Sequence, residues 1–282
     1  MKEVSIRSTP ESLEATVFES DQENTVVIIS SATGVKQEYY QKIAQFLSKE
    51  GITVITFDYQ GIGRSLKKPI KSLQHNASDW ARVDLESVIQ YVQATYPNSK
   101  KVILGHSIGG QLVGMAKSSK QMDKLILVAA QSGYWKYWSG TGRAKMGFNW
   151  HILFPSLLRV FGYLPAKKVS SMEDLPKNVA NQWRTWGKHK DYIFSDKTLQ
   201  DTYYHELTMP LTAFSIDDDE YAPKAAVEWM IAQYGNAKKK SIHLVPSELA
   251  VNKIGHFGVF KEKFTPTIWQ QILSEIKEET PE

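Results

Sequence analysis

The chain has 282 residues, 42% of them hydrophobic and 23% charged, so it is long enough for one large globular domain, or two smaller ones, with a buried core. It contains no cysteine, which excludes disulfides, a thiolate nucleophile and a cysteine-based metal site, and the cytoplasm is the expected location. The net charge of +4 is spread along the chain and no apolar run of about eighteen residues occurs, so we expect no nucleic-acid binding and no membrane insertion. The only dense cluster of charge, Lys238-Lys239-Lys240, is expected in a solvated loop or at a helix end.

The first half of the chain alternates between predicted strands and helices. Alternation of apolar and polar residues predicts an antiparallel hairpin over residues 3–8 and 13–19. Apolar runs then predict buried strands, and helical periodicity predicts helices, at the following places: strands at 26–30, 52–57, 102–104 and 125–129, and helices at 38–49 and 79–96. This order predicts parallel strands that are joined by right-handed crossovers.

The segment Gly-His-Ser-Ile-Gly at residues 105–109 lies between the strand at 102–104 and a predicted helix at 110–117. This arrangement is typical of a nucleophile elbow, a tight turn that exposes a serine hydroxyl. The two glycines leave room where the strand and helix backbones approach each other, and Ser107 takes the strained conformation at the apex. The neighbouring His106 is expected to point away from the nucleophile and to be structural.

The alternation stops near residue 131 and resumes with strands at 210–216 and 241–245 and helices at 223–234 and 265–276. The interruption is rich in Trp, Tyr and Phe and is too long for a plain connection. We expect residues 131–206 to form a helical cap over the carboxyl ends of the strands, where ligands bind in such sheets, with the core at 1–130 and 207–282. Aromatic residues of the cap, such as Trp183 and Trp186, either form its own small core or also line a substrate pocket.

A serine nucleophile needs a base to take its proton, and the base needs a third group to fix its orientation. With a nucleophile elbow, the expected chain order is Ser, then an acid, then His. The strand at 210–216 is followed by Asp217-Asp218-Asp219, and His256 follows the last strand within a glycine-flanked loop. The predicted catalytic groups are therefore Ser107, His256 and one of these aspartates. The remaining histidines show no metal-ligand spacing, so neither a metal nor a cofactor is expected.

Three further segments carry a family resemblance. Residues 57–65 are similar to the D-x-R-G-x-G-x-S loop of the α/β-hydrolase superfamily, with Gln60 where that pattern usually has Arg, and residues 255–258 are similar to its histidine loop. Residues 219–223 resemble its acid loop, in which a proline commonly comes four residues after the Asp. The chain therefore resembles this superfamily over almost its whole length, apart from the cap. The resemblance implies a mostly parallel twisted sheet with helices on both faces and an inserted helical cap.

The same resemblance bears on the choice of acid and on the branch of the superfamily. The spacing to Pro223 favours Asp219 as the triad acid, with Asp218 as the alternative. Residues 32–35 and 39–40, together with the two cap tryptophans named above, resemble a poorly characterised branch of predicted bacterial hydrolases, which implies no particular substrate.

The oxyanion hole of such an enzyme needs two backbone N–H groups. One is expected from Ile108, directly after the nucleophile, and the other from Thr33, unless the segment 31–34 is only a turn that joins a strand to a helix. The sequence thus predicts a serine hydrolase that cleaves a carboxylic ester or a related acyl compound through an acyl-enzyme. Acyltransferases, thioesterases and amidases use the same triad, and a non-catalytic binding protein on this scaffold is the competing class. The expected partner is a small-molecule acyl substrate, and the oligomeric state is left open.

Overall fold

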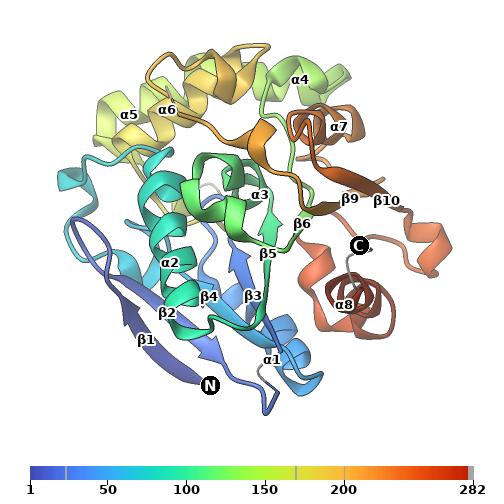
Figure 1. Cartoon of the computed structure of the whole chain (residues 1–282). Coiled ribbons are helices and arrows are strands. Elements are labelled where there is room, and N and C mark those ends of the chain that lie inside the picture. The colour runs from blue at the N-terminus through green and yellow to red at the C-terminus, as the bar shows by residue number, and fades with distance from the viewer. Residues whose placement is uncertain (23, 169, 200, 279–282) are drawn as a thin grey trace.

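A computed structural model describes residues 1–22, 24–168, 170–199 and 201–278 (Figure 1). Within these residues one sheet of eight strands has the order β1-β2-β4-β3-β5-β6-β9-β10. The pairs β1·β2 and β2·β4 are antiparallel, and all other neighbours in the sheet are parallel. The bounds of its strands are β1 Lys2–Ile6, β2 Leu13–Phe18, β3 Thr25–Ser30, β4 Thr53–Phe57, β5 Lys100–His106, β6 Lys124–Val128, β9 Pro210–Ile216 and β10 Lys238–Leu244.

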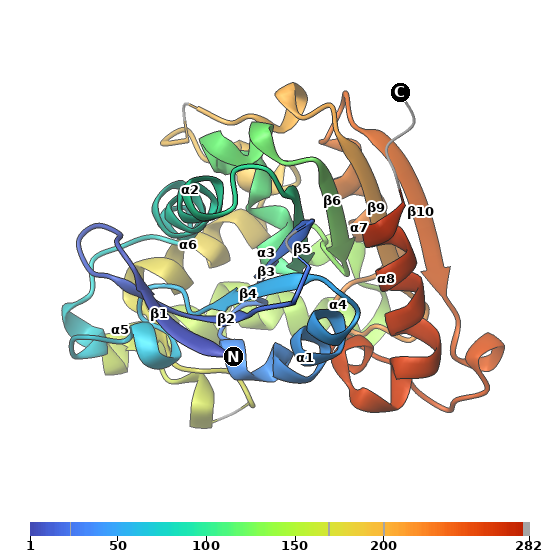
Figure 2. The same cartoon turned by 60° about the horizontal axis from the view of Figure 1, so that its bottom comes forward.

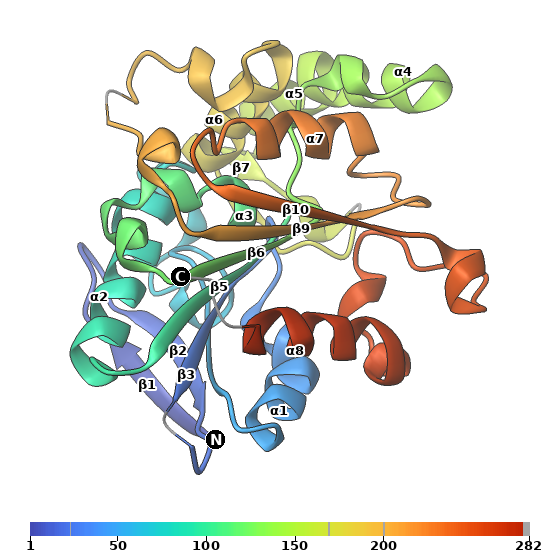
Figure 3. The same ribbon diagram turned by 45° about the vertical axis from the view of Figure 1, so that its right-hand side comes forward.

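Helices cover both faces of this sheet (Figures 2 and 3). Helices α1 (Gln41–Lys49) and α8 (Gln270–Lys277) lie on one face, whereas α2 (Glu86–Thr95), α3 (Ile108–Gln111) and α7 (Lys224–Ala232) lie on the other. The central strands are apolar and buried along their length because both of their faces are covered. The expected α/β class, with a mostly parallel sheet and helices on both faces, is confirmed.

The helix expected at residues 110–117 is much shorter in the structure. Helix α3 ends at Gln111, and tight 3₁₀ turns follow at Val113–Met115 and Lys117–Gln121. The carbonyl oxygens of Gly110 and Gln111, which would continue the helix, instead accept the hydroxyl groups of Tyr234 and Tyr204. That expectation is therefore wrong, because tyrosines from distant segments take the helical acceptors and glycine has a low helix propensity.

The lysine cluster at residues 238–240 is also placed differently from the expectation. It forms the exposed first half of β10, which pairs with β9 at the edge of the sheet, and is neither a loop nor a helix end. Lysines on an edge strand discourage pairing with other chains. Lys240 Nζ lies 2.6 Å from the Glu275 carboxylate on α8, so part of this charge is neutralised within the fold.

Residues 131–206 contain the helices α4 (Gly140–Phe148), α5 (Phe154–Phe161) and α6 (Lys177–Lys188), and a short antiparallel pair of β7 (Tyr163–Leu164) with β8 (Leu175–Pro176). Figure 1 shows the three helices together beyond the ends of β3 and β5, at the edge of the sheet where the elbow lies. None of the helices in the described part of the chain is long and apolar enough to cross a membrane.

Candidate active site

Ser107 sits at the tight turn between β5 and α3. Its backbone has φ 53° and ψ −121°, a conformation that is costly for a residue with a side chain. A Cβ on Gly105 would lie 2.5 Å from Gly110 Cα, and one on Gly109 would lie 2.1 Å from the Ser30 oxygen. The two glycines are thus required by backbone contacts on both sides of the turn, as the elbow pattern predicts.

His256 and Asp219 form a close pair beside this turn. His256 Nδ1 lies 2.7 Å from Asp219 Oδ2, and both side chains are buried. The other oxygen, Asp219 Oδ1, accepts the backbone N–H groups of Tyr221 and Ala222 at 2.8 and 2.9 Å. The carboxylate is therefore held in one orientation, and the imidazole is oriented through its Nδ1.

The two preceding aspartates have different partners. Asp218 accepts the backbone N–H groups of Ile254 and Gly255 at 3.0 and 2.8 Å, so it anchors the loop that carries the histidine. Asp217 lies at the surface, 3.5 Å from His243 Nε2. The structure thus brings Asp219, and neither neighbour, to the His256 ring.

The two predicted oxyanion donors, Thr33 and Ile108, come from two different segments next to Ser107. Ile108 is the first residue of α3, where backbone N–H groups have no partner within the helix. Thr33 lines the same cavity as Ser107 and His256, and the backbone just before it at Ser30 and Ser31 packs against Gly109. Across the described residues, neither the Thr33 nor the Ile108 N–H donates to another protein group.

A series of hydrogen bonds connects the segment 31–34, which follows β3, with the histidine loop at residues 255–258. The Ala32 N–H donates to the Tyr40 hydroxyl at 2.9 Å, and that hydroxyl donates to His106 Nδ1 at 2.9 Å. His106 Nε2 then donates to the carbonyl of His256 at 3.1 Å. Burial, and to a smaller extent the charge of His256, holds the pKa of His106 well below its ordinary value. The ring is therefore neutral, as this series of hydrogen bonds requires. His106 is structural, as expected, and it connects three loops of the site.

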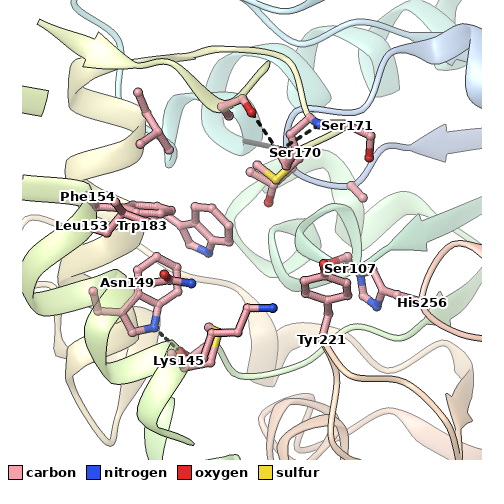
Figure 4. Close-up of a pocket in the computed structure, with 18 of the residues that line it drawn as sticks. Ser107, Lys145, Asn149, Leu153, Phe154, Ser170, Ser171, Trp183, Tyr221 and His256 are labelled. Carbon is pink, nitrogen blue, oxygen red and sulfur yellow. Dashed lines mark hydrogen bonds between the residues drawn. The ribbon is translucent and has the colours of Figure 1, made fainter. Parts of the chain in front are cut away.

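Ser107 and His256 open into a cavity of about 320 Å³. Figure 4 shows Ser107, His256 and Tyr221 at one end, with Leu153, Phe154 and Trp183 at the other. The apolar part of the lining comes mainly from residues 146–183: Met146, Trp150, Leu153, Phe154, Leu157, Leu164, Met172 and Trp183. Aromatic residues of the segment 131–206 therefore line the cavity as well as packing against one another.

The two predicted pocket tryptophans differ in position. Trp183 lines the cavity, and its Nε1 donates to the Tyr192 hydroxyl. Trp186 does not line it, because the side chain is fully buried and its Nε1 donates to Asp196 at 2.9 Å. In the described ranges, no group of three or more His, Cys, Asp or Glu side chains could hold a metal ion.

Two glutamines of the site carry no sequence motif. Gln131 follows β6, and its Oε1 accepts from Ser107 Oγ at 3.4 Å and from Gln111 Nε2 at 3.0 Å. Its position after a parallel strand was a usable signal, because such strand ends meet at the ligand-binding edge of the sheet. Gln111 gave no signal, since a glutamine on a helix is usually exposed.

Comparison with known proteins identifies the family. A family model described as serine aminopeptidase, S33, matches residues 21–247. The chain belongs to this family. The expected membership in the α/β-hydrolase superfamily is confirmed, and the chain is an α/β hydrolase. Whether it belongs to the bacterial branch stays a prediction.

Solved structures agree with this fold. A soluble variant of monoglyceride lipase from Saccharomyces cerevisiae, in complex with a substrate analog, is 14% identical with a TM-score of 0.70, over 100% of this chain and 96% of that chain. A highly thermostable carboxyl esterase from Bacillus coagulans is 14% identical with a TM-score of 0.63, over 98% and 97%. An esterase from Exiguobacterium antarcticum is 17% identical with a TM-score of 0.62, over 98% and 100%. At such identities the likeness concerns the α/β-hydrolase fold alone.

Proposed function

We propose that this α/β hydrolase is a serine hydrolase that cleaves a carboxylic ester through an acyl-enzyme. The proposal rests on one observation: the strained Ser107 opens into the same cavity as His256, whose Nδ1 pairs with Asp219. A strained serine, a histidine and a buried carboxylate that pairs with the histidine are the parts that acyl transfer needs.

Each residue then has one task in the reaction. Ser107 Oγ attacks the ester carbonyl while His256 takes its proton and passes it to the leaving alcohol. Asp219 orients the imidazole and stabilises its cationic form. The backbone N–H groups of Thr33 and Ile108 stabilise the oxyanion, and their lack of other acceptors among the described groups supports this role. A water activated by the same histidine then releases the acid.

The lining of the cavity favours an ester substrate over a peptide with a free amino terminus, which is the substrate of an aminopeptidase. An aminopeptidase binds the free ammonium group of a peptide, which a nearby carboxylate stabilises best. Among the described lining residues there is no Asp, Glu or Arg, and Lys145 is the one lysine, so the lining offers a positive charge and no carboxylate. Figure 4 shows the amine of Lys145 reaching into the cavity, where it would repel an ammonium group.

The shape of the cavity indicates where the acyl group binds. The apolar residues at the end away from Ser107 suit a hydrocarbon chain, and the volume of about 320 Å³ is at the lower end of ligand pockets. We therefore expect a small or medium acyl group. The similar folds of a monoglyceride lipase and a carboxyl esterase support ester chemistry. The cytoplasmic location stays part of this proposal.

Covalent labelling tests the proposal. A fluorophosphonate should modify wild-type protein at Ser107, as located by peptide mass spectrometry, and Ser107→Ala should abolish both labelling and hydrolysis of p-nitrophenyl esters. A series of esters with increasing acyl length, run beside the matching p-nitroanilides and thioesters, identifies the preferred acyl compound. Failure to label any serine would favour a non-catalytic binding protein on this fold.

A further inference from the structure

The hydroxyl group of Ser107 is turned toward Gln131. Ser107 Oγ lies 3.4 Å from Gln131 Oε1, and among the described residues it makes no hydrogen bond with His256. Gln131 is 7% exposed, follows β6 in the chain and lines the same cavity. The serine hydroxyl therefore faces an amide oxygen, which cannot act as a base, and is not bonded to the imidazole.

The orientation of the Gln131 amide is set by its own donor side. Gln131 Nε2 lies 3.0 Å from the carbonyl oxygen of Tyr221, which can only accept a hydrogen bond. The NH₂ group must therefore face Tyr221, and the oxygen must face Ser107. Because this oxygen can only accept, the hydrogen bond between them uses the proton of Ser107.

A second set of contacts is consistent with the same orientation. The indole N–H of Trp183 can only donate, and it donates to the Tyr192 hydroxyl at 3.2 Å. Tyr192 then donates to Gln111 Oε1 at 2.9 Å, and Gln111 Nε2 donates to Gln131 Oε1 at 3.0 Å. We call Trp183, Tyr192, Gln111 and Gln131 the amide relay. The direction of these hydrogen bonds agrees with the orientation that the Tyr221 carbonyl sets for the Gln131 amide.

We propose that Gln131 is a positioning residue that holds the Ser107 hydroxyl away from His256 in the free enzyme. For the reaction Ser107 must then rotate, so that its hydroxyl group gives up the hydrogen bond to Gln131 Oε1 and donates to the imidazole of His256 instead. At 3.4 Å the hydrogen bond is long for a hydroxyl donor, so the hold is weak and easily released. This inference rests on the proposed serine hydrolase function.

The test uses three variants and one small probe. Diethyl p-nitrophenyl phosphate phosphorylates an active serine with release of p-nitrophenol, and its small ethyl groups make few contacts with the far end of the cavity. Gln131→Met keeps the size of the side chain but removes the acceptor, so the second-order rate of phosphorylation should rise about twofold, the low end of the effect of one neutral hydrogen bond. Gln131→Glu puts a charged acceptor in the same place, so the rate should fall about tenfold.

Gln111→Met is the matched control. It also removes a buried amide with two side-chain hydrogen bonds in the relay, but leaves Gln131 Oε1 free to accept from Ser107. Its phosphorylation rate should not rise. A residue that only supports the fold would lower the rate in both Gln131 variants, and that result, or an equal rise in Gln111→Met, would overturn the inference.

A crystal structure of the free wild-type protein separates this inference from the proposed function. Ser107 Oγ bonded to His256 Nε2 in a wild type that reacts normally with the probe would refute the role of Gln131 and leave the hydrolase intact. This measurement also decides the question if Gln131→Met does not fold. A wild type that does not react at Ser107 would overturn both proposals together.

Discussion

Three consecutive aspartates follow β9, and each has a different set of partners. Asp217 is at the surface, Asp218 binds two backbone N–H groups of the histidine loop, and Asp219 reaches the ring of His256. The chain turns directly after the strand, so successive side chains point in different directions. Asp218 therefore stabilises the histidine loop, whereas Asp219, which is itself held by two backbone N–H groups, fixes the tautomer of the imidazole.

The first prediction separates these two tasks. Asp219→Asn should reduce kcat for a p-nitrophenyl ester by on the order of 10⁴-fold, because an amide at this place can favour the wrong histidine tautomer, as known from serine proteases. Asp218→Asn should reduce kcat only about tenfold, since it weakens the anchoring of the loop and leaves the His256 partner in place. Thermal melting of both variants checks that the fold is retained. The opposite ranking would identify Asp218 as the triad acid.

At the scale of elements, the elbow depends on the contact between β3 and the start of α3. The second prediction is that Gly109→Ala lowers the unfolding free energy by about 3 kcal/mol, because its Cβ would lie 2.1 Å from the Ser30 oxygen, where only backbone is available to move. Denaturation by urea measures the change. Gly258→Ala is the control, since its Cβ would meet neighbours at an ordinary 3.6 Å. Equal stability of the two variants would show that the elbow is looser than described.

The helices of residues 131–206 supply the apolar end of the cavity, and the two tryptophans of α6 give a matched pair. The third prediction is that Trp183→Phe shifts the ester preference toward longer acyl chains, because a smaller ring enlarges the cavity that it lines. Trp186→Phe should leave the preference unchanged. Each variant loses one indole hydrogen bond, which costs about 1 kcal/mol, and Trp186→Phe should be the less stable of the two because it also leaves a void in the core. Acyl-length profiles with thermal melting check both, and equal shifts would contradict the placement of Trp183.

At the scale of the whole molecule, one buried acid makes stability depend on pH. The fully buried Asp84 precedes α2, and it accepts the backbone N–H and the side-chain amide of Gln60, each at 2.8 Å. Both donors of Gln60 are neutral, so no positive charge stabilises the ionised carboxyl group there. Burial raises the pKa of Asp84 from 3.8 to about 7, an effect that these hydrogen bonds only partly offset.

The fourth prediction follows from the sign of this shift. A raised pKa means that the folded state binds more protons than the unfolded state between about pH 4 and pH 7, so stability is lost as the pH rises through that window. Asp84→Asn cannot ionise. The unfolding free energy of wild type should therefore fall by about 3 kcal/mol relative to that of Asp84→Asn between pH 5 and pH 8. Urea denaturation at both pH values measures this difference, and parallel pH profiles would mean that Asp84 is ionised throughout.

Most of the fold could be predicted from the sequence because its signals are local. Apolar runs of strand length, helical periodicity and turn residues identified the strands of the sheet and the helices α1, α2, α7 and α8, with ends off by a few residues. The elbow was visible for the same reason, since the glycines at 105 and 109 and the positive φ of Ser107 are demands of one short turn. The order of nucleophile, acid and histidine could be read along the chain without any knowledge of the distances between them.

The rest was decided by contacts between segments far apart in the sequence. The length of α3 depends on tyrosines 93 and 124 residues away, which take its carbonyl groups. Trp183 and Trp186 lie on one helix, and only packing against the core decides which of them faces the cavity. The amide relay joins residues 111, 131, 183 and 192, and hydrogen bonds between such separated side chains leave no periodic trace in the sequence. The sequence by itself thus determined the strands, the elbow and the order of the candidate triad, because these follow from local backbone geometry. The tertiary structure alone decided which aspartate, which tryptophan and which glutamine surround Ser107, because side-chain direction depends on the packing of the whole chain.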